Sequence, residues 1–252
     1  MKLNESSAVS TTRALLVPYE SRHVPTYHQW MEDPAIQAAT ASERLTLEEE
    51  YENQQSWRSS HDKLTFIICQ PVVTPTSSSP PTSVHAVQAG HVDAPSKMIG
   101  DVNLFLYPND DEEDQADGNW FQCIGEVDIM IASEEHRGKG LGRAVVSGFL
   151  QYIARNLEGV LREYYTGERE LANSNNNNND SPMLKRPRLR MLMAKINKDN
   201  AKSIALFKSL GFEQEGDVNY FGEVKLVLRD LGAYAARNVP EGYKEVVYER
   251  RD

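Results

Sequence analysis

The stretch that decides the fold reads Gly125-Glu-Val-Asp-Ile-Met-Ile-Ala-Ser-Glu-Glu-His-Arg-Gly-Lys-Gly-Leu-Gly142 and continues into Arg143-Ala-Val-Val-Ser-Gly-Phe-Leu150. Val127, Ile129 and Ile131 occupy every second position, a period that predicts a strand with one face on a core. Glycines then occupy every second position from 138 to 142, and apolar residues follow at helical spacing. The stretch therefore predicts a strand, a glycine-rich turn and a helix.

The turn between this strand and this helix predicts an anion-binding site. The first N–H groups of a helix lack partners within the helix, and the helix dipole places partial positive charge there. Glycines let the backbone approach a phosphate closely, and Arg137, Lys139 and Arg143 add positive charge. A diphosphate is the ligand that fits such a turn.

The spacing within the turn separates the classes of phosphate-binding protein. A P-loop requires Ser or Thr after the lysine, but Lys139 is followed by Gly140, which disfavours a nucleoside triphosphatase. A dinucleotide fingerprint requires Gly-x-Gly-x-x-Gly, and these glycines are spaced Gly-x-Gly-x-Gly. The segment Arg137-Gly-Lys-Gly-Leu-Gly142 instead resembles the Arg-x-x-Gly-x-Gly pyrophosphate loop of the GNAT superfamily of N-acetyltransferases, which holds acetyl-CoA.

A second segment carries the same resemblance. Residues 200–212 predict a helix capped by Asn200 and ended by Gly211. The segment is similar to the Asn-x-x-Ser-x-x-Leu-Tyr/Phe-x-x-x-Gly-Phe pattern of the superfamily. The resemblance implies that Asn200 and Ser203 contact the pantetheine arm, although helix capping is an equal alternative for them. It also places Phe207 where many members carry a tyrosine that acts as the acid.

The front half narrows the resemblance to the N-acetyltransferase 9-like branch of the superfamily. The blocks that carry it are Val17-Pro-Tyr19, His23-Val24, Tyr27-His28-x-Trp30-Met31, Thr40 to Glu43, Leu45 to Tyr51, Gln55-Ser-Trp57, Asp62 to Ile67 and Gly100 to Phe105. This implies an α/β fold of the GNAT type, with a central mixed sheet covered by helices on both faces. It implies transfer of acetyl from acetyl-CoA to a protein or peptide amine, without a covalent enzyme intermediate. An N-terminal amine is favoured by similarity to bacterial ribosomal-protein acetyltransferases.

The resemblance also assigns roles in the site. A bulge in the strand before the loop would expose the backbone of Met130, Ile131 and Ala132 to the pantetheine arm and the thioester carbonyl. The loop itself contributes residues from Arg137 to Arg143, namely Gly138, Lys139, Gly140, Leu141 and Gly142 between them.

Two carboxylates and three hydroxyls are candidates for the proton transfers. We expect Glu126, and then Asp128, to act as the base; their alternative role is that of polar residues on the wet face of a strand. Since a phenyl ring cannot donate a proton, a tyrosine elsewhere (Tyr164, Tyr165 or Tyr220) would supply the acid, or the thiolate would leave unaided. A coenzyme A-binding interaction protein with little turnover is the alternative function that Phe207 leaves open.

Composition limits the other possibilities. The chain has 252 residues, 40% of them hydrophobic, a formal charge of −10 and a negative mean hydropathy. No apolar run is long enough to cross a bilayer, and the acidic balance argues against nucleic-acid binding. Two cysteines and six histidines show no disulfide or metal-ligand pattern, so no metal site is predicted. We expect a cytoplasmic protein, with the nucleus possible if Lys185-Arg-Pro-Arg188 acts as a localisation signal.

The remaining pattern predicts one domain over residues 12–230 and a tail over 231–252. Helices are expected over 21–31, 46–57, 141–157 and from 200; strands over 13–18, 64–69, 98–107, 121–131, 189–196 and 221–228. Three interruptions, over 71–97, 108–119 and 166–187, are rich in Pro, Ser, Thr, acidic residues or Asn. Such segments bury little apolar surface, and we expect flexible loops.

Overall fold

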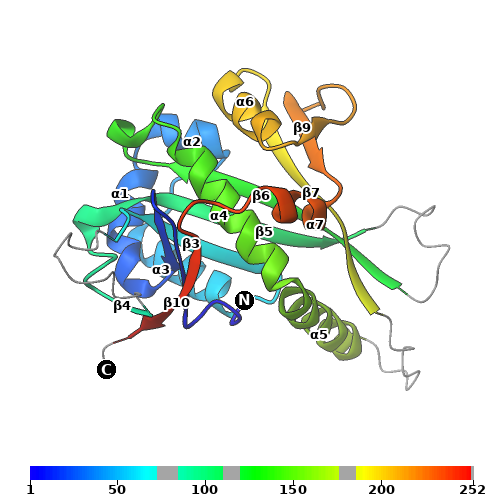
Figure 1. The fold of residues 1–252 in the computed structure, drawn as a ribbon, viewed down its shortest axis with the longest axis horizontal. Coiled ribbons are helices and arrows are strands. Elements are labelled where there is room, and N and C mark those ends of the chain that lie inside the picture. The colour runs from blue at the N-terminus through cyan, green and yellow to red at the C-terminus, as the bar shows by residue number, and fades with distance from the viewer. Residues whose placement is uncertain (73–84, 110–119, 176–185, 251–252) are drawn as a thin grey trace.

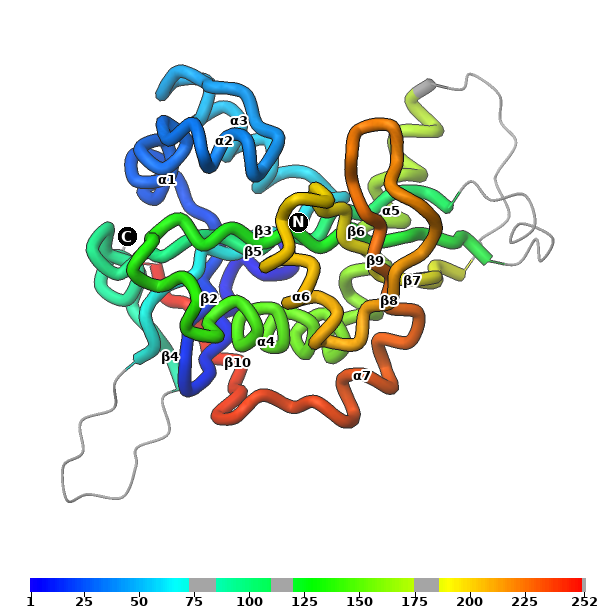
Figure 2. Tube along the Cα trace, turned by 90° about the horizontal axis from the view of Figure 1, so that it is seen from above, coloured from blue at the N-terminus to red at the C-terminus, as the bar shows by residue number. Residues whose placement is uncertain are grey.

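The computed structural model describes residues 1–72, 85–109, 120–175 and 186–250. They form one ten-stranded sheet in the order β4-β10-β1-β2-β3-β5-β6-β7-β9-β8. Neighbouring strands are antiparallel except for the β6–β7 and β10–β4 pairs, which are parallel. The helices lie on both faces of this sheet (Figure 1, Figure 2), which confirms the predicted α/β architecture.

The front half follows the local signals of the sequence. It contains β1 (Ser7–Ser10), β2 (Leu15–Pro18), α1 (Val24–Met31), α2 (Pro34–Thr40), α3 (Leu47–Ser59) and β3 (Lys63–Cys69). Pro18 ends β2, and Pro25 is accommodated in the first turn of α1. Thr46 and Glu49 form the predicted capping box of α3. The short elements β1 and α2 were not predicted.

The middle of the chain corrects two of the predicted loops. It contains β4 (Ala86–Gln88), β5 (Met98–Pro108), β6 (Trp120–Ile131), α4 (Leu141–Arg155), α5 (Leu157–Asn175) and β7 (Arg186–Asn197). Residues 166–175 belong to α5, because Val160, Leu161 and Tyr164 anchor this helix in the core. Residues 86–88 of the first interruption pair with β10. Residues 73–84, 110–119 and 176–185 of the three interruptions lie outside the described residues.

The last segment places the C-terminal tail inside the fold. After α6 (Ala201–Ser209), β8 (Glu213–Gln214) and β9 (Glu223–Leu228) come α7 (Leu231–Arg237) and β10 (Lys244–Glu249). The prediction that the domain ends at residue 230 needs correction, because β10 lies between β1 and β4. Val246 and Tyr248 alternate with exposed residues along β10 and are buried.

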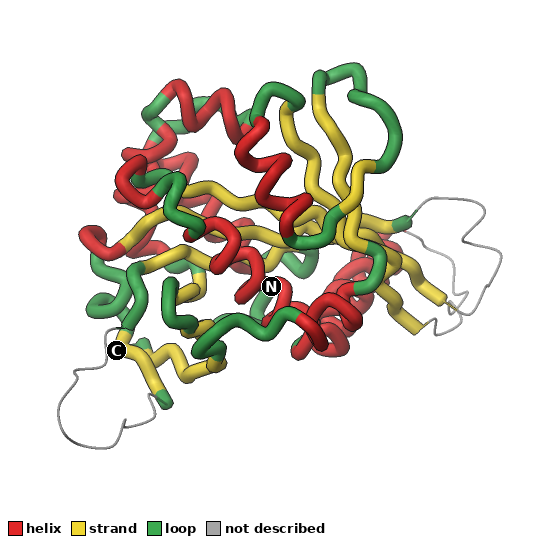
Figure 3. The backbone as a smooth tube through the Cα atoms, turned by 45° about the horizontal axis from the view of Figure 1, so that its top comes forward, coloured by secondary structure: helices red, strands yellow, loops and turns green. Residues whose placement is uncertain are grey.

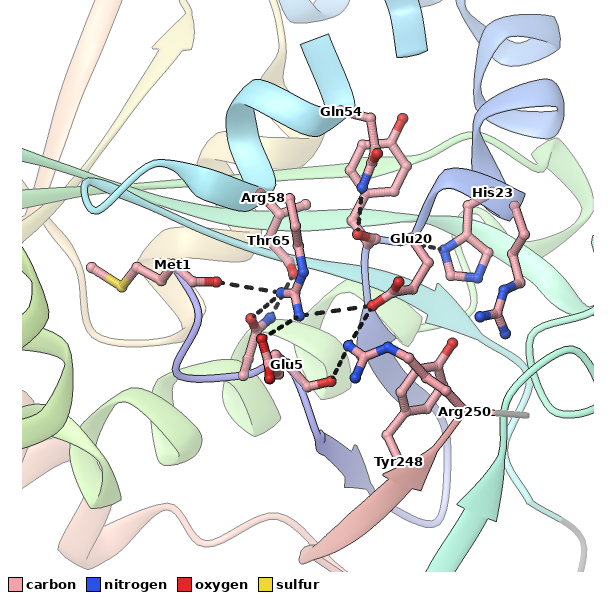
Figure 4. Close-up of polar contacts among 12 residues, drawn as sticks. Met1, Glu5, Glu20, His23, Gln54, Arg58, Thr65, Tyr248 and Arg250 are labelled. Atoms are coloured by element: carbon pink, nitrogen blue, oxygen red, sulfur yellow. Dashed lines mark hydrogen bonds and ion pairs between the residues drawn. The ribbon is translucent and has the colours of Figure 1, made fainter. Parts of the chain in front are cut away.

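A partly buried polar cluster fastens the two ends of the chain to each other. Arg58 donates to the carbonyl oxygen of Met1, and its guanidinium lies 3.7 Å from Glu20. Arg250, just after β10, donates to the backbone oxygen of Glu5 and, at 2.8 Å, to Glu20. Figure 4 shows both guanidinium groups converging on Glu20. The N-terminal segment and β10 are thereby held on the same side of the sheet.

Two apolar layers cover the two faces of the sheet. Figure 2 shows α1, α2 and α3 on one side and α4, α6 and α7 on the other. One core cluster includes Val146, Phe149 and Ile153 of α4, while a second includes Val24, Tyr27 and Met31 of α1. Figure 3 shows the strands running between these helical layers. None of the helices within the described ranges is long and apolar enough to cross a membrane.

The centre of the sheet opens at one end. β6 and β7 pair from Trp120 opposite Arg186 to Glu126 opposite Met193, and no further. Beyond that point β6 stays with β5 as far as Ile131, and β7 stays with β9 as far as Asn197. The two parallel strands therefore diverge, and a cavity of about 630 Å³ lies between their ends and α1–α3.

Candidate functional site

The glycine-rich turn lies at the end of β6 and forms the N-terminus of α4. Gly138 and Gly140 have φ of +72° and +75°, in the left-handed region that favours glycine. An added Cβ at either residue would meet no atom within 4 Å, so the space above the turn is open. Residues 137–140 are exposed. The turn therefore has room for an anion.

The backbone of this turn offers donors that the described chain does not use. Gly140 is the N-cap residue of α4 and provides no side-chain cap. The N–H groups of residues 138–143 have no acceptor among the described residues, and the first helical hydrogen bond runs from Ala144 to the Gly140 carbonyl. Six consecutive amides at a helix N-terminus suit a diphosphate.

The cationic side chains of the turn have different partners. Arg137 donates to the carbonyl oxygens of Ile131, at 2.7 Å, and Ala132, at 3.0 Å. Arg143 donates to the Ser209 carbonyl at 2.6 Å and its hydroxyl at 2.7 Å. Both guanidiniums brace the turn against neighbouring elements, and that of Arg137 is also ion-paired with Glu134 at 3.6 Å. Lys139 makes no ion pair with any described residue, so its ammonium remains available to a ligand.

The bulge expected in this strand lies directly after β6. The β5–β6 ladder keeps a regular register from Pro108 opposite Cys123 to Gly100 opposite Ile131. The one register shift along β6 lies at Cys123–Ile124, against β7. Ala132 and Ser133 then both donate their N–H groups to the Ile99 carbonyl, at 2.9 and 3.2 Å, so two residues oppose one, as in a β-bulge. The Ala132 N–H is therefore not free to bind a pantetheine arm.

The alternation of the ladder identifies which amides of β6 are free. Since alternate residues of an antiparallel pair turn their N–H groups to the same partner, Met130 also faces β5. The N–H of Val127 is used in the last β6–β7 pair, Glu126 opposite Met193, whereas Ile129 and Ile131 turn their N–H groups toward the side that β7 has left. Of the three expected amides, Ile131 is the one directed to the opening.

The two candidate carboxylates both line the cavity, and their environments differ. Glu126 is paired with the Lys195 ammonium of β7 at 2.9 Å. Asp128 has no ion pair with a described residue. Asp128 is exposed to solvent at the cavity wall, with the carboxylates of Glu126 and Asp101 on the same wall. Burial first, and then the negative charges of Glu126 and Asp101, raise the pKa of Asp128 to about 7.

A buried polar group on β5 completes this wall. Asp101 is 2% exposed, and its Oδ2 accepts a hydrogen bond from Asn103 Nδ2 at 2.7 Å. The Tyr27 hydroxyl lies 3.5 Å from the same oxygen. Burial raises the pKa of the Asp101 carboxyl to about 6, against the opposing effect of these two donors. Asp101, Asn103 and Tyr27 all line the cavity.

Helix α6 contributes the opposite wall. Asn200 caps this helix by accepting the Ser203 N–H at 3.1 Å, as predicted. Asn200, Ser203 and Phe207 all line the cavity. Phe207 packs edge-on against Phe212 with ring centres 5.1 Å apart. Ser203 lies one helical turn before Phe207, so its hydroxyl lies on the side of α6 where the expected tyrosine is missing.

The three tyrosines considered as acids lie elsewhere. Tyr164 and Tyr165 pack on Phe121, near the start of β6. Seven residues separate Phe121 from Asp128, which is about 23 Å along a strand. Tyr220 is 97% exposed. Tyr164 and Tyr165 are therefore remote from the carboxylates, and Tyr220 is not held in place by packing.

Sequence reasoning missed several residues of the site. Asp101 and Asn103 appeared only as part of a family block, and Lys195 and Glu223 were not singled out. A buried strand that carries two polar residues at a spacing of two, as Gly100-Asp-Val-Asn-Leu-Phe105 does, was the available signal. Tyr27 and Trp57, which also appeared only within family blocks, line the cavity as well.

Comparisons with known proteins agree with this geometry. The family description "Acetyltransferase (GNAT) domain" matches residues 13–213. An alpha/beta-tubulin-N-acetyltransferase 9 of Drosophila melanogaster is 37% identical over 226 residues, covering 90% of this chain and 88% of the relative. An N-acetyltransferase 9-like protein of Caenorhabditis briggsae is 34% identical over 229 residues, with coverage of 90% and 88%.

A solved structure supports the fold. The spermidine N-acetyltransferase of Vibrio cholerae, in complex with CoA and spermine, superimposes with a TM-score of 0.52 at 15% identity, covering 86% of this chain and 96% of that one. The predicted resemblance is therefore confirmed, and acetyl-CoA is the cosubstrate. The chain belongs to the GNAT family of acetyltransferases, in its N-acetyltransferase 9-like branch, and is an acetyl-CoA-dependent N-acetyltransferase.

Proposed function

We propose that this protein acetylates the N-terminal amino group of a protein, with Asp128 as the base. The observation that carries the proposal is the Asp128 carboxylate, whose pKa of about 7 places it between its two protonation states near neutral pH. A general base works best when its pKa lies near the working pH. Glu126, which ranked first from the sequence, is held in an ion pair with Lys195 and serves in our proposal to tune Asp128.

The transfer would proceed by direct attack. The acceptor ammonium gives one proton to the Asp128 carboxylate and becomes a neutral amine. Its nitrogen attacks the thioester carbonyl carbon, so a C–N bond forms and the C–S bond breaks. The sulfur takes the bonding electron pair, the new amide nitrogen loses its second proton, and the thiolate gains one. The amides of Ile129 and Ile131, which β7 leaves unpaired, are the donors available for the thioester carbonyl and the pantetheine arm.

Ser203 is our candidate for the group that serves the leaving thiolate. Its hydroxyl lines the cavity on the same face of α6 as Phe207. Phe207 itself is 2% exposed and carries no proton donor. A hydroxyl within reach of the sulfur stabilises a thiolate by hydrogen bonding even when it does not transfer a proton.

The cavity suits a cationic acceptor. Four carboxylates (Asp101, Glu126, Asp128 and Glu223) and one ammonium (Lys195) line it. This excess of negative charge attracts a protonated amine and disfavours an anionic acceptor.

The cavity edge suits a macromolecular acceptor. Phe221 contributes to the cavity wall and is 79% exposed, beside Tyr220 at 97%. Exposed aromatic side chains beside a site favour contact with a large partner. The name of the Drosophila relative points to tubulin as one protein to test.

A peptide assay tests the proposal. Purified protein and acetyl-CoA are incubated with a peptide from the tubulin N-terminus, and separately with a lysine-containing peptide whose N-terminus is blocked. Mass spectrometry locates the acetyl group. Acetylation of the free N-terminus alone supports the proposal, whereas acetylation of lysine alone refutes the N-terminal assignment.

The same assay decides the alternative. A coenzyme A-binding interaction protein with little turnover would bind acetyl-CoA and acetylate neither peptide.

We also propose a cytoplasmic location. The two free buried cysteines, Cys69 and Cys123, support it, because reducing compartments keep thiols free. We also propose that nucleic acid is not a partner, because the acidic cavity would repel its phosphates.

A further inference from the structure

Two buried oxygens in the cavity wall lack hydrogen-bond donors among the described residues. They are Oδ1 of Asp101 and Oδ1 of Asn103. The two residues are 2% and 5% exposed, and both line the cavity. Buried side-chain oxygens in folded proteins nearly always have a donor. Two such acceptors belong to residues that line one cavity, and a ligand in that cavity is the nearest source of donors for them.

The orientation of the Asn103 amide is fixed by its neighbour. Its Nδ2 donates to Asp101 Oδ2 at 2.7 Å. Rotating the amide by half a turn would place Oδ1 against a carboxylate oxygen, where neither atom has a proton to share. The free Asn103 atom is therefore an acceptor.

The β-sheet register places both acceptors next to Asp128. Asn103 is directly opposite Asp128, and Asp101 is opposite Met130, on adjoining strands. Directly opposed residues have Cβ atoms about 5 Å apart, and diagonal neighbours about 7–8 Å. Asp101, Asn103 and Asp128 occupy alternate positions on β5 and the matching position on β6, so their side chains lie on one face of the sheet.

We propose that Asp101, Asn103 and Asp128 together bind the acceptor as a primary ammonium, one N–H on each residue. The inference deepens the function proposed above and rests on it. A primary ammonium carries three N–H groups, which matches three acceptors. A hydroxyl or an N-methylated amine offers fewer donors and leaves at least one buried oxygen unpaired. The site thereby selects a free, unmethylated amine.

The same arrangement would keep the nitrogen in place during the reaction. When one proton passes to Asp128, the neutral amine retains two N–H groups for Asp101 and Asn103. The nitrogen therefore has the lone pair that it needs for attack while Asp101 and Asn103 still hold it in place. Tyr27, which approaches Asp101 Oδ2, and the Asn103 amide orient the carboxylate and act as positioning groups.

The test compares two acceptors in three variants. The acceptors are a peptide with a free N-terminal amine and the same peptide with an N-monomethylated terminus. The variants are Asn103→Leu, the isosteric Asp101→Asn and a control, Thr65→Val. Thr65 Oγ1 is also buried without a partner among the described residues, on β3 opposite Asn103, but Thr65 lies outside the 630 Å³ cavity. A thermal melt first confirms that each variant folds.

The expected results show whether Asp101 and Asn103 bind the ammonium or only pack in the cavity wall. Both cavity variants should raise the acceptor KM about tenfold, the effect of losing one hydrogen bond to a charged group, with the acetyl-CoA KM unchanged. The wild-type preference for the free amine should shrink by about the same factor in Asn103→Leu, because the contact that the methyl group blocks is already gone. Thr65→Val should behave as the wild type.

Two outcomes would overturn the inference. An unchanged acceptor KM in both cavity variants would contradict it, as would an undiminished preference for the free amine in Asn103→Leu. If the wild type acetylates no peptide, the proposed function fails. In that case calorimetry measures the dissociation constant of the free-amine peptide in the wild type and in both cavity variants. Weaker binding in the variants supports the ammonium site, and equal or unmeasurable binding refutes it.

Discussion

Replacing Glu126 by glutamine distinguishes the two carboxylates of β6. If Asp128 is the base, Glu126→Gln keeps most of the turnover and moves the acid limb of the pH–rate profile to lower pH. Two effects have this sign. The variant removes a negative charge beside Asp128, and it leaves the Lys195 ammonium, which lies 2.9 Å from Glu126, without its counter-charge. Asp128→Asn should instead abolish the limb and lower kcat by about 10²- to 10⁴-fold.

The size of the shift follows from the strand geometry. Residues two apart on a strand lie on one face at a separation of about 7 Å. Two unit charges at that distance interact by about 2 kcal/mol at an effective dielectric constant of 20. Because Lys195 already offsets part of the Glu126 charge, about half of this survives, which is slightly less than one pH unit. The limb should therefore move from about pH 7 to about pH 6.

The assay is kcat/KM for the acceptor, since this parameter reports the pKa of the free enzyme, to which the value of about 7 belongs. In the wild type, activity at pH 5 should be about one hundredth of the plateau, because about 1% of a group with a pKa near 7 is then ionised. A loss of activity in Glu126→Gln as large as that in Asp128→Asn would refute the assignment and return the role to Glu126. A limb that moves to higher pH would contradict the electrostatic reasoning.

Three further predictions concern stability and cofactor binding. Asp128→Asn should raise the melting temperature at pH 8 but not at pH 4. The pKa of Asp128 is about 7 in the folded state and lower in the unfolded state, so the wild type loses stability as the pH rises between these two values. The asparagine amide does not ionise and carries no such penalty. Gly100→Ala should lower the free energy of unfolding, measured with denaturant, by about 3 kcal/mol, because the added Cβ would lie 1.9 Å from the Met130 carbonyl oxygen. Gly232→Ala is the control, since the nearest atom to its added Cβ is 3.5 Å away. Gly140→Ala should raise the acetyl-CoA KM about tenfold with little effect on the acceptor KM, because φ of +75° is strained for alanine and a methyl group would enter the anion space; an unchanged acetyl-CoA KM would remove the turn from the binding site.

The elements that the sequence predicted well are those with strong local signals. The capping box at Thr46, the Asn200 cap and the alternation along β6 each specify their structure within a few residues, and the structure confirms them. The predicted glycine-rich turn is also present, and Gly138 and Gly140 have the positive φ that favours glycine. Local chemistry was sufficient in these places because no distant contact competes with it.

The remaining elements depend on contacts that local patterns do not encode. β4 has three residues and exists because β10, far along the chain, pairs with it. α5 continues into a polar segment that composition alone assigns to a loop, since Tyr164 anchors its first half. A C-terminal strand inserted between β1 and β4 is a tertiary arrangement without a motif.

In the site, too, residue types were predictable from the sequence, whereas their contacts were not. The pair Glu126 and Asp128 was visible in the sequence, but which of them is paired depends on Lys195, which reaches Glu126 from the neighbouring strand. The fixed partners of Arg137 and Arg143 and the used N–H of Ala132 also required the structure. Charge can be read from a sequence, whereas partners and burial come from the fold.

Hydrogen–deuterium exchange of the backbone amides with and without coenzyme A tests the central claim most directly. Our account predicts that coenzyme A slows exchange of the amides of residues 138–143, whose N–H groups have no acceptor in the described chain. Pantetheine, which lacks the diphosphate, should leave these amides unchanged. Equal exchange of residues 138–143 with and without saturating coenzyme A would contradict the account.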